Sequence, residues 1–280
     1  FLVLLSFLAL VVNSCADSEE TKTNKASDNT TPKMHKTTAK CSRVCDGLVL
    51  YLPMIDNTTD VNTDTFGNII DNNSLSVSTN NSNTTPTLAS DRDSIDNASY
   101  RFDGTDDFLQ VDNVSSIALE SGSFSVAAIV KVNQSSDEWI DYSGGQFSKG
   151  EIMNGDNYTF IMGYHWYPEG TNNLWFAVRN SSGIATNAYT NKTNPLQYNH
   201  IVGVADRASG TVNLYVNGTL MAGTAWDGNI KDPATKWTIG LSGNSSWEKK
   251  HRGNLDGWID EVRVYNRALS ADEVRALYAY

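Results

Sequence analysis

The end of the chain constrains the fold more than any other segment. Residues 257–265 read Gly-Trp-Ile-Asp-Glu-Val-Arg-Val-Tyr, a β-branched and aromatic run that predicts a strand. Ser270 and Glu273 then form the S-x-x-E pattern of a capping box at the beginning of a helix. Apolar residues follow at helical spacing, at Val274, Leu277 and Tyr278. We therefore expect a strand, a polar corner and a short helix that lays one apolar face on the domain.

Short apolar runs separated by turn residues fill the chain before this ending. Each run is rich in β-branched and aromatic residues and predicts a strand. They occupy residues 47–53, 75–77, 100–102, 108–111, 124–132, 158–162, 174–178, 200–205, 212–216 and 237–240. Asn217-Gly218 after one of them is typical of a hairpin turn. Many short strands with one terminal helix predict an all-β fold, a two-sheet antiparallel jelly-roll sandwich with a short C-terminal helix.

Composition limits the classes of function. With 280 residues, of which 40% are hydrophobic, the chain can bury one sizeable core, so one domain with a tail is expected. The formal net charge is −11, and the few basic residues are scattered along the sequence. Binding to a phosphate backbone needs clustered Lys and Arg. Nucleic acid is therefore not an expected partner.

The N-terminal segment predicts export. Residues 1–12 are almost wholly apolar and have the length of a signal-peptide core, too short to span a bilayer comfortably. The run ends at Asn13-Ser14-Cys15, which resembles a bacterial lipobox, and this resemblance implies that Cys15 is lipidated. Residues 1–15 are thus expected to be a signal peptide, and the protein an outer-membrane or cell-surface lipoprotein held by its lipid anchor. Simple cleavage and secretion is the alternative.

A polar segment with two cysteines follows the leader. Residues 16–45 contain few hydrophobic side chains and are expected to form a disordered tether. Cys41 and Cys45 are separated by three residues, and in an exported chain they are expected to form a disulfide. A metal site is the alternative, but it needs more ligands than this pair offers.

The closing segment and several others resemble one known family. The run from Gly257 to Ser270 is similar to the terminal strand and cap of laminin-G-like jelly-roll domains of the concanavalin A-like lectin/glucanase superfamily. Further matching segments appear in the same order, at residues 48–53, 102–108, 123–126, 147–150, 199–202 and 214–218. The resemblance covers residues 46–280 and implies a single jelly-roll domain there. A long polar insertion at residues 57–93 and an extended segment at residues 164–173 depart from the pattern.

Catalysis is not expected, although the resembled superfamily includes glucanases and lyases. Retaining glucanases need two carboxylates about 5 Å apart, presented by one strand. Glu138 and Asp141 offer at most one suitable spacing, while Asp260 and Glu261 are adjacent and would face opposite sides of a regular strand. His200 lies in an apolar strand and is expected to be a packed, hydrogen-bonded core residue rather than a base. No catalytic residue is assigned.

An acidic turn is a candidate calcium site. Residues 102–107 read Phe-Asp-Gly-Thr-Asp-Asp and supply carboxylates and carbonyls, the oxygen ligands that Ca²⁺ prefers. The family resemblance implies a structural calcium between this turn and the closing strand, held by Asp103, Gly104, Asp106 and Asp260. The alternative is that Asp103-Gly104 only builds a tight turn and that Asp260 caps a backbone amide.

Aromatic residues in expected loops are candidates for sugar binding. Residues 164–173 combine flat rings with hydrogen-bonding side chains, a mixture that suits a carbohydrate. The candidate ligand-binding residues are Tyr164, Trp166, Tyr167, Asn172, Trp226 and Trp247. Trp175 and Trp237 fall inside expected strands and are assigned to the core. Burial at the edge of the sandwich is the alternative for each loop tryptophan.

These observations favour a non-catalytic cell-surface carbohydrate-binding or adhesion module, with a polysaccharide or glycoconjugate as its partner. A glycan-active enzyme of the same fold, of glucanase or lyase type, is the alternative from another class. A purely structural surface module is the third hypothesis, and it would bind no ligand.

Overall fold

The computed structural model describes residues 44–54, 76–78, 85–117, 119, 122–133, 147–155, 159–166, 172–231, 236–241 and 254–279. All of these lie within one compact unit, His35–Tyr280. The predicted signal peptide, Cys15, the tether up to residue 43 and Cys41 lie outside the described residues. The lipid anchor and the disulfide between Cys41 and Cys45 therefore stay predictions. Among the described residues, no helix has the length and apolar character needed to cross a membrane.

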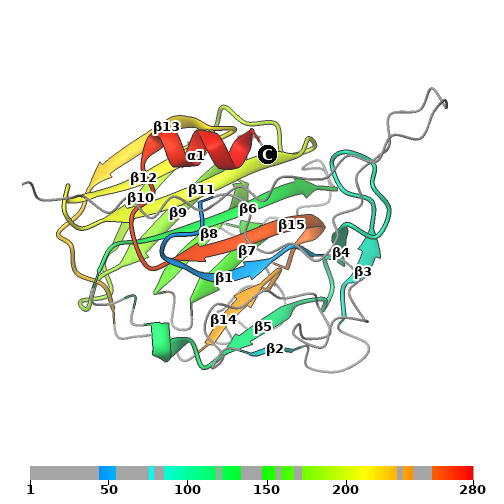
Figure 1. Ribbon diagram of the computed structural model, residues 1–280, viewed down its shortest axis with the longest axis horizontal. Helices are drawn as coiled ribbons and strands as arrows, with labels where there is room; N and C mark the ends of the chain where they lie inside the picture. The colour runs from blue at the N-terminus through cyan, green and yellow to red at the C-terminus, as the bar shows by residue number, and fades with distance from the viewer. Residues whose placement is uncertain are drawn as a thin grey trace, which may run out of the picture. The chain divides into compact units, whose positions relative to one another are not determined.

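Two antiparallel sheets form the body of the domain (Figure 1), which confirms the predicted all-β sandwich. Sheet A has the strand order β13-β12-β11-β6-β15-β4-β3, and β1 also pairs with β15. Its strands are β1 (Leu48–Leu52), β3 (Thr87–Ala89), β4 (Ser99–Asp103), β6 (Phe124–Val132), β11 (Asn199–Asp206), β12 (Thr211–Val216), β13 (Thr219–Ala225) and β15 (Asp256–Tyr265).

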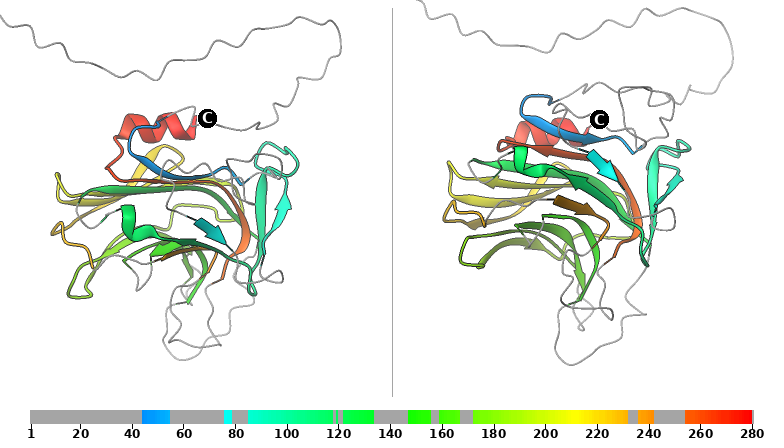
Figure 2. Two further views of the ribbon diagram at one scale, coloured as in Figure 1. Left: turned by 60° about the horizontal axis from the view of Figure 1, so that its bottom comes forward. Right: turned by 90° about the horizontal axis from the view of Figure 1, so that it is seen from below.

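Sheet B has the strand order β10-β9-β8-β7-β14-β5-β2. Its strands are β2 (Ser76–Ser78), β5 (Leu109–Asp112), β7 (Phe147–Gly155), β8 (Phe160–Trp166), β9 (Asn172–Arg179), β10 (Ala185–Thr190) and β14 (Lys236–Ile239). A short 3-10 helix, η1 (Val114–Ile117), follows β5. Figure 2 shows the two sheets as separate layers.

The main core lies between the sheets. Alternate residues of each strand point inward, as the two-residue period of a strand requires. Phe124 of sheet A meets Phe160 and Phe176 of sheet B, with ring centroids 5.7 and 6.2 Å apart, and Phe160 meets Trp237 at 6.0 Å. Trp237 is fully buried, so its assignment to the core is confirmed. These tilted and edge-on contacts are the arrangements that aromatic rings prefer.

A second apolar cluster lies on the outer face of sheet A. The helix α1 (Ala271–Tyr278) covers this face (Figure 2) and buries Val274 and Leu277. The Ser270 side chain accepts a hydrogen bond from the Glu273 backbone N–H, and the Glu273 carboxylate accepts one from the Ser270 backbone N–H. Both halves of the predicted capping box are therefore present.

The hairpin turn between β12 and β13 also follows the prediction. Asn217 and Gly218 both have positive φ, 49° and 76°, as a two-residue hairpin turn of the primed type requires. The Asn217 side-chain oxygen accepts a hydrogen bond from the His200 backbone N–H at 2.9 Å. The turn thus ties its hairpin to β11.

Candidate functional site

The outer face of sheet B carries a row of exposed and half-buried side chains. On β9, Leu174, Phe176 and Val178 belong to the core cluster, so Trp175 between them points outward. Tyr189 of β10 is the direct cross-strand partner of Trp175 and is 63% exposed. Trp175 itself is half-buried, so its assignment to the core is wrong. The two aromatic rings are neighbours on one surface.

The partner of Trp175 on the other side is Gly163 of β8, which has no side chain. The neighbouring strand therefore adds no side chain of its own at this position of the row. Aromatic side chains with a polar atom are suited to such half-wet positions.

Side-chain amides flank the aromatic pair. Asn173 lies two residues before Trp175 on β9, and Asn187 lies two residues before Tyr189 on β10, so both share the outward direction. The Asn187 Oδ1 atom is buried and has no hydrogen-bond partner among the described residues. We call Asn173, Trp175, Asn187 and Tyr189 the sheet B platform.

The predicted sugar-binding residues near this platform lie in different environments. Tyr164 is fully buried and belongs to the core, so its assignment to a sugar-binding surface is wrong. Its inward direction follows from the alternation of β8, and burial raises the pKa of its hydroxyl well above the ordinary value. Trp166 and Asn172 are strand residues rather than loop residues and are cross-strand partners at the end of the β8–β9 hairpin. Tyr167 lies outside the described residues.

Of the two remaining tryptophan candidates, only one lies among the described residues, and it is buried. Trp226 follows β13 but is only 6% exposed, and its Nε1–H donates a hydrogen bond to the Asn229 carbonyl at 2.9 Å. Its proposed role as a loop platform is wrong, because the ring closes the edge of the core. Trp247 lies outside the described residues.

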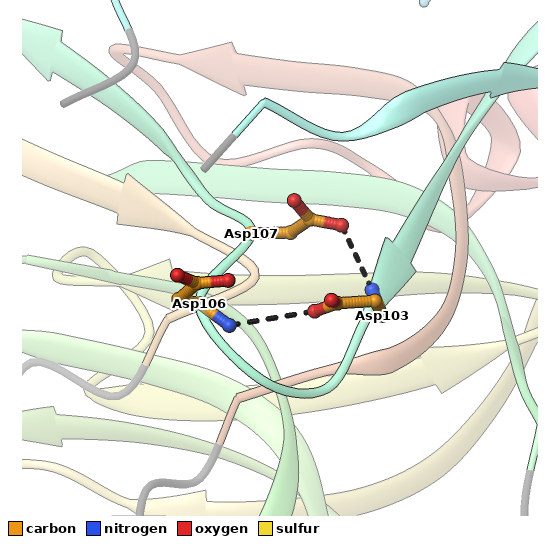
Figure 3. Close-up of side chains that lie close together, drawn as sticks. All are labelled: Asp103, Asp106 and Asp107. Atoms are coloured by element: carbon orange, nitrogen blue, oxygen red, sulfur yellow. Dashed lines mark hydrogen bonds between the residues drawn. The ribbon is translucent and has the colours of Figure 1, made fainter. Parts of the chain in front are cut away.

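The acidic turn between β4 and β5 brings three carboxylates together (Figure 3). Oxygen atoms of Asp103, Asp106 and Asp107 all lie within 4.8 Å of one another. The Asp103 carboxylate accepts a hydrogen bond from the Thr105 N–H at 2.7 Å, and the Asp107 carboxylate accepts one from the Asp103 N–H at 3.0 Å. Burial raises the pKa of Asp107, and the charges of Asp103 and Asp106 raise it further. A bound cation would relieve that repulsion.

A buried amide also contacts this turn. The Asn254 side chain donates a hydrogen bond to the Thr105 carbonyl at 2.5 Å. Its own Oδ1 atom is buried and has no partner among the described residues. Carboxylate, carbonyl and amide oxygens are the ligand types of calcium, so this donor set fits the ion.

The closing strand does not bring Asp260 to the turn. In the β4–β15 pair, Asp256 is the partner of Asp103, whereas Asp260 is the partner of Ile129 on β6. Four residues along a strand correspond to roughly 13 Å. Including Asp260 in the same ligand set as Asp103 is therefore wrong. Asp256 lies closer, but its carboxylate forms an ion pair with Arg101.

Asp260 and Glu261 stand at a bulge rather than in a regular strand. β15 has two residues between Asp260 and Arg263 where β6 has one, and Glu261 has a φ of 55°. Glu261 forms a buried ion pair with Arg263 and accepts a hydrogen bond from the Tyr51 hydroxyl at 2.8 Å. We call Tyr51, Glu261 and Arg263 the buried ionic cluster. The Glu261 carboxylate is thus held between partners beneath β1.

His200 is buried, as predicted, on the same outer face of sheet A. Its ring stacks on Tyr278 of α1, with centroids 6.1 Å apart. The expected hydrogen bonds are not present, because neither ring nitrogen has a partner among the described residues. Burial lowers the pKa of this imidazole to about 3, so it stays neutral.

The platform residues Asn187 and Tyr189 were missed in the sequence. Residues 185–190 read Ala-Thr-Asn-Ala-Tyr-Thr and carry no strong apolar alternation. One indication was available, since a single tyrosine directly follows the small apolar residue at 188. Only the pairing of β10 with β9 shows that this tyrosine stands beside Trp175.

Comparison with known proteins supports the fold. A family model described as "Concanavalin A-like lectin/glucanases superfamily" matches residues 103–275. A search of curated protein sequences finds no match.

Several solved structures share the fold at low sequence identity. The botulinum neurotoxin serotype G binding domain is 13% identical, with a TM-score of 0.58 over 83% of this chain and 50% of its own. The binding domain of Paraclostridial Mosquitocidal Protein 1 is 18% identical, with a TM-score of 0.58 over 83% and 52%. A botulinum neurotoxin type C structure, whose title states that cell entry depends on interaction with two ganglioside molecules, is 11% identical, with a TM-score of 0.55 over 83% and 51%. The chain thus spans about half the length of these neighbours.

Proposed function

The chain belongs to the concanavalin A-like lectin/glucanase superfamily, and we propose that it is a non-catalytic carbohydrate-binding or adhesion module at the cell surface. The observation that carries this proposal is the sheet B platform, where Tyr189 and Trp175 stand side by side on an outer sheet face. The ligand would be a polysaccharide or glycoconjugate. Binding domains among the structural neighbours support a binding role over a catalytic one.

The platform has the chemistry that sugar recognition needs. A pyranose ring presents C–H groups on one face and hydroxyls at its rim. The Trp175 and Tyr189 rings would stack on the C–H face, and the amides of Asn173 and Asn187 would form hydrogen bonds with the hydroxyls. Trp166 and Asn172, at the end of the β8–β9 hairpin, would add a separate glycan contact at that end of the sheet, together with Tyr167.

A glycan array followed by calorimetry on the full chain tests this function. We expect Tyr189→Ala to bind the best array glycan roughly tenfold more weakly, since stacking on one ring contributes about 1–2 kcal/mol. Leu220→Ala is the matched control, because Leu220 is a similarly exposed apolar residue on sheet A. A parent protein that binds no arrayed glycan would favour the purely structural module. Hydrolysis or elimination products from a bound glycan would favour the enzyme.

We also propose a structural calcium ion at the acidic turn, with Asp103, Asp106, Asp107 and Asn254 as its protein ligands and the Gly104 carbonyl available nearby. The ion would neutralise the clustered carboxylates and hold β4, β5 and the segment before β15 together. Calcium at 100 times its Kd should stabilise the fold by about 2.7 kcal/mol, measured as a rise in Tm over protein with chelator. Asp106→Asn should reduce that rise, while Asp112→Asn on β5 should leave it unchanged. A Tm that calcium does not move in the parent would contradict the site.

For localisation, we propose export and a lipid anchor at Cys15. A single acyl-bearing residue would hold the module at the outer membrane or cell surface without touching the sandwich. Cys15→Ser should move the protein from the membrane fraction to the soluble fraction. Mass spectrometry of the mature protein decides the point, since an unmodified first residue would contradict lipidation.

A further inference from the structure

A second row of side chains, on the outer face of sheet A, alternates cations and aromatic rings. Trp258 of β15 is the cross-strand partner of both Arg101 on β4 and Lys131 on β6. Each of these residues has a sequence neighbour in the inner core, at Phe102, Ile259 and Val130, so all three side chains point outward. Tyr198, which precedes β11, completes the row. We call Arg101, Trp258, Lys131 and Tyr198 the cation–aromatic row.

The cations of this row are held in place by the rings. The Arg101 guanidinium carbon lies 4.8 Å from the Trp258 ring centroid, and the Lys131 ammonium lies 4.7 Å from it. The same ammonium lies 5.6 Å from the centroid of Tyr198. These distances fall within the range of cation–π contacts. Two flexible side chains are therefore positioned before any ligand arrives, which lowers the entropic cost of binding one.

The row also retains a charge that none of the described residues neutralises. Arg101 forms an ion pair with Asp256. The Lys131 ammonium contacts the two rings, and among the described residues no carboxylate lies within ion-pair distance of it. A cation–π contact leaves the positive charge and the three N–H donors of the ammonium unused. All four members of the row are half-buried and so reachable from solvent.

We propose that the cation–aromatic row binds an acidic glycan, one that carries carboxylate or sulfate groups. The acidic group would pair with the Lys131 ammonium and with guanidinium N–H groups of Arg101, and the sugar ring would lie against Tyr198. Such a charged ligand needs a local positive site, because the chain as a whole has a net charge of −11 and repels anions. The aromatic members favour a sugar over an acidic peptide. This inference rests on the proposed glycan-binding function but uses the opposite sheet.

Calorimetry with the full chain and paired probes tests the inference. Oligogalacturonate and its methyl ester share one sugar backbone, and esterification removes the carboxylate charge; dextran sulfate and dextran form the matching pair for sulfate. We expect the charged member of at least one pair to bind more tightly, with an affinity that falls as salt is raised. Lys131→Met keeps the aliphatic stem and removes the charge. It should weaken binding of the charged probe about tenfold, a ratio that corresponds to about 1.4 kcal/mol.

Controls separate this site from the sheet B platform. Lys131→Arg should retain binding, and Lys192→Met, which removes a charge from an exposed loop, should leave it unchanged. Tyr189→Ala should weaken the array glycan but not the acidic probe. An unchanged melting temperature for Lys131→Met shows that the loss is not a folding defect.

Three results would overturn the inference. The first is a charged probe that binds no better than its neutral partner, and the second is full binding by Lys131→Met. The third is equal, Lys131-dependent binding of poly-glutamate, which would show recognition of carboxylates irrespective of the sugar. None of these results contradicts glycan binding at the sheet B platform. A parent protein that binds no neutral glycan would contradict the platform instead.

Discussion

The two outer faces of the sandwich are built by the same alternation of strand residues, yet they meet different surroundings. On sheet A, outward residues such as Tyr51, Tyr265 and Val202 are buried, because α1 and the segment before it pack over them. On sheet B, the outward residues Trp175 and Tyr189 stay partly or largely exposed. Outward aromatic residues thus stabilise the fold where α1 covers sheet A, and they stay accessible to a ligand on sheet B.

The difference extends to charge. The covered face contains the buried ionic cluster and the neutral His200, while the sheet B platform has amides and rings but no described acid or base. Burying charges is costly unless they are paired, so substitutions on the covered face should act on stability. Those on the platform should act on binding.

The largest expected effect comes from breaking the buried ionic cluster. Arg263→Met leaves the Glu261 carboxylate buried without its cation, and this should lower the free energy of unfolding by about 3–5 kcal/mol. Urea denaturation measures the loss. The double variant Glu261→Gln/Arg263→Met should recover part of it, because the unpaired charge is gone. A single variant as stable as the parent would show that the cluster is not desolvated and would weaken the contrast between the faces.

Removing the cover of sheet A should have the next largest effect. Leu277→Ala deletes a buried side chain of α1 and should cost about 2–4 kcal/mol through lost burial and the cavity left behind. Leu220→Ala, at a 53% exposed position on β13, should change stability by less than about 0.5 kcal/mol. Equal costs for the two variants would mean that α1 does not stabilise the domain.

The pH dependence of stability sharpens the comparison further. The pKa of His200 is about 3 in the folded protein, because burial disfavours its charged form, against 6.5 when unfolded. The unfolded chain therefore binds an extra proton between these values, so stability is fully present above pH 6.5 and is lost as pH falls toward 3. The slope contributed by this one group is at most about 1.4 kcal/mol per pH unit.

A non-titrating ring isolates this contribution. His200→Phe keeps a flat ring against Tyr278, and its stability should fall less steeply than that of the parent between pH 6.5 and 4. The Glu273 carboxylate, whose hydrogen bond from Arg267 lowers its pKa to about 2, also loses its stabilising effect below about pH 4.5. It is common to both proteins, so the difference between their curves belongs to His200. Parallel curves would mean that the imidazole is solvated.

The smallest stability effect is expected on the sheet B platform. Tyr189→Ala should change the free energy of unfolding by less than about 0.5 kcal/mol, since the side chain is mostly exposed. Trp166→Ala, at the last residue of β8, should weaken glycan binding and leave the domain folded. A large loss of stability in either variant, measured by thermal unfolding, would show that these rings support the fold rather than a ligand.

The sequence alone determined those features that depend on local pattern. The strand period, the Asn217-Gly218 turn and the Ser270–Glu273 capping box are each set by a few neighbouring residues, and the structure confirms all three. The acidic turn was recognisable for the same reason, since Asp103, Asp106 and Asp107 lie within five residues of one another. The sandwich class followed from the number of strands and the single helix.

Only the tertiary structure decided which outward residues are covered and which meet across strands. Tyr164 and Trp226 read as loop aromatics but are buried, while Trp175 reads as core but is half-exposed. Strand register pairs Asp103 with Asp256 and leaves Asp260 four residues further along β15, while the Asn254 amide contacts the turn. Pairings such as Trp175 with Tyr189, and Trp258 with Arg101 and Lys131, depend on strand order, which joins segments far apart in the chain and leaves no local pattern.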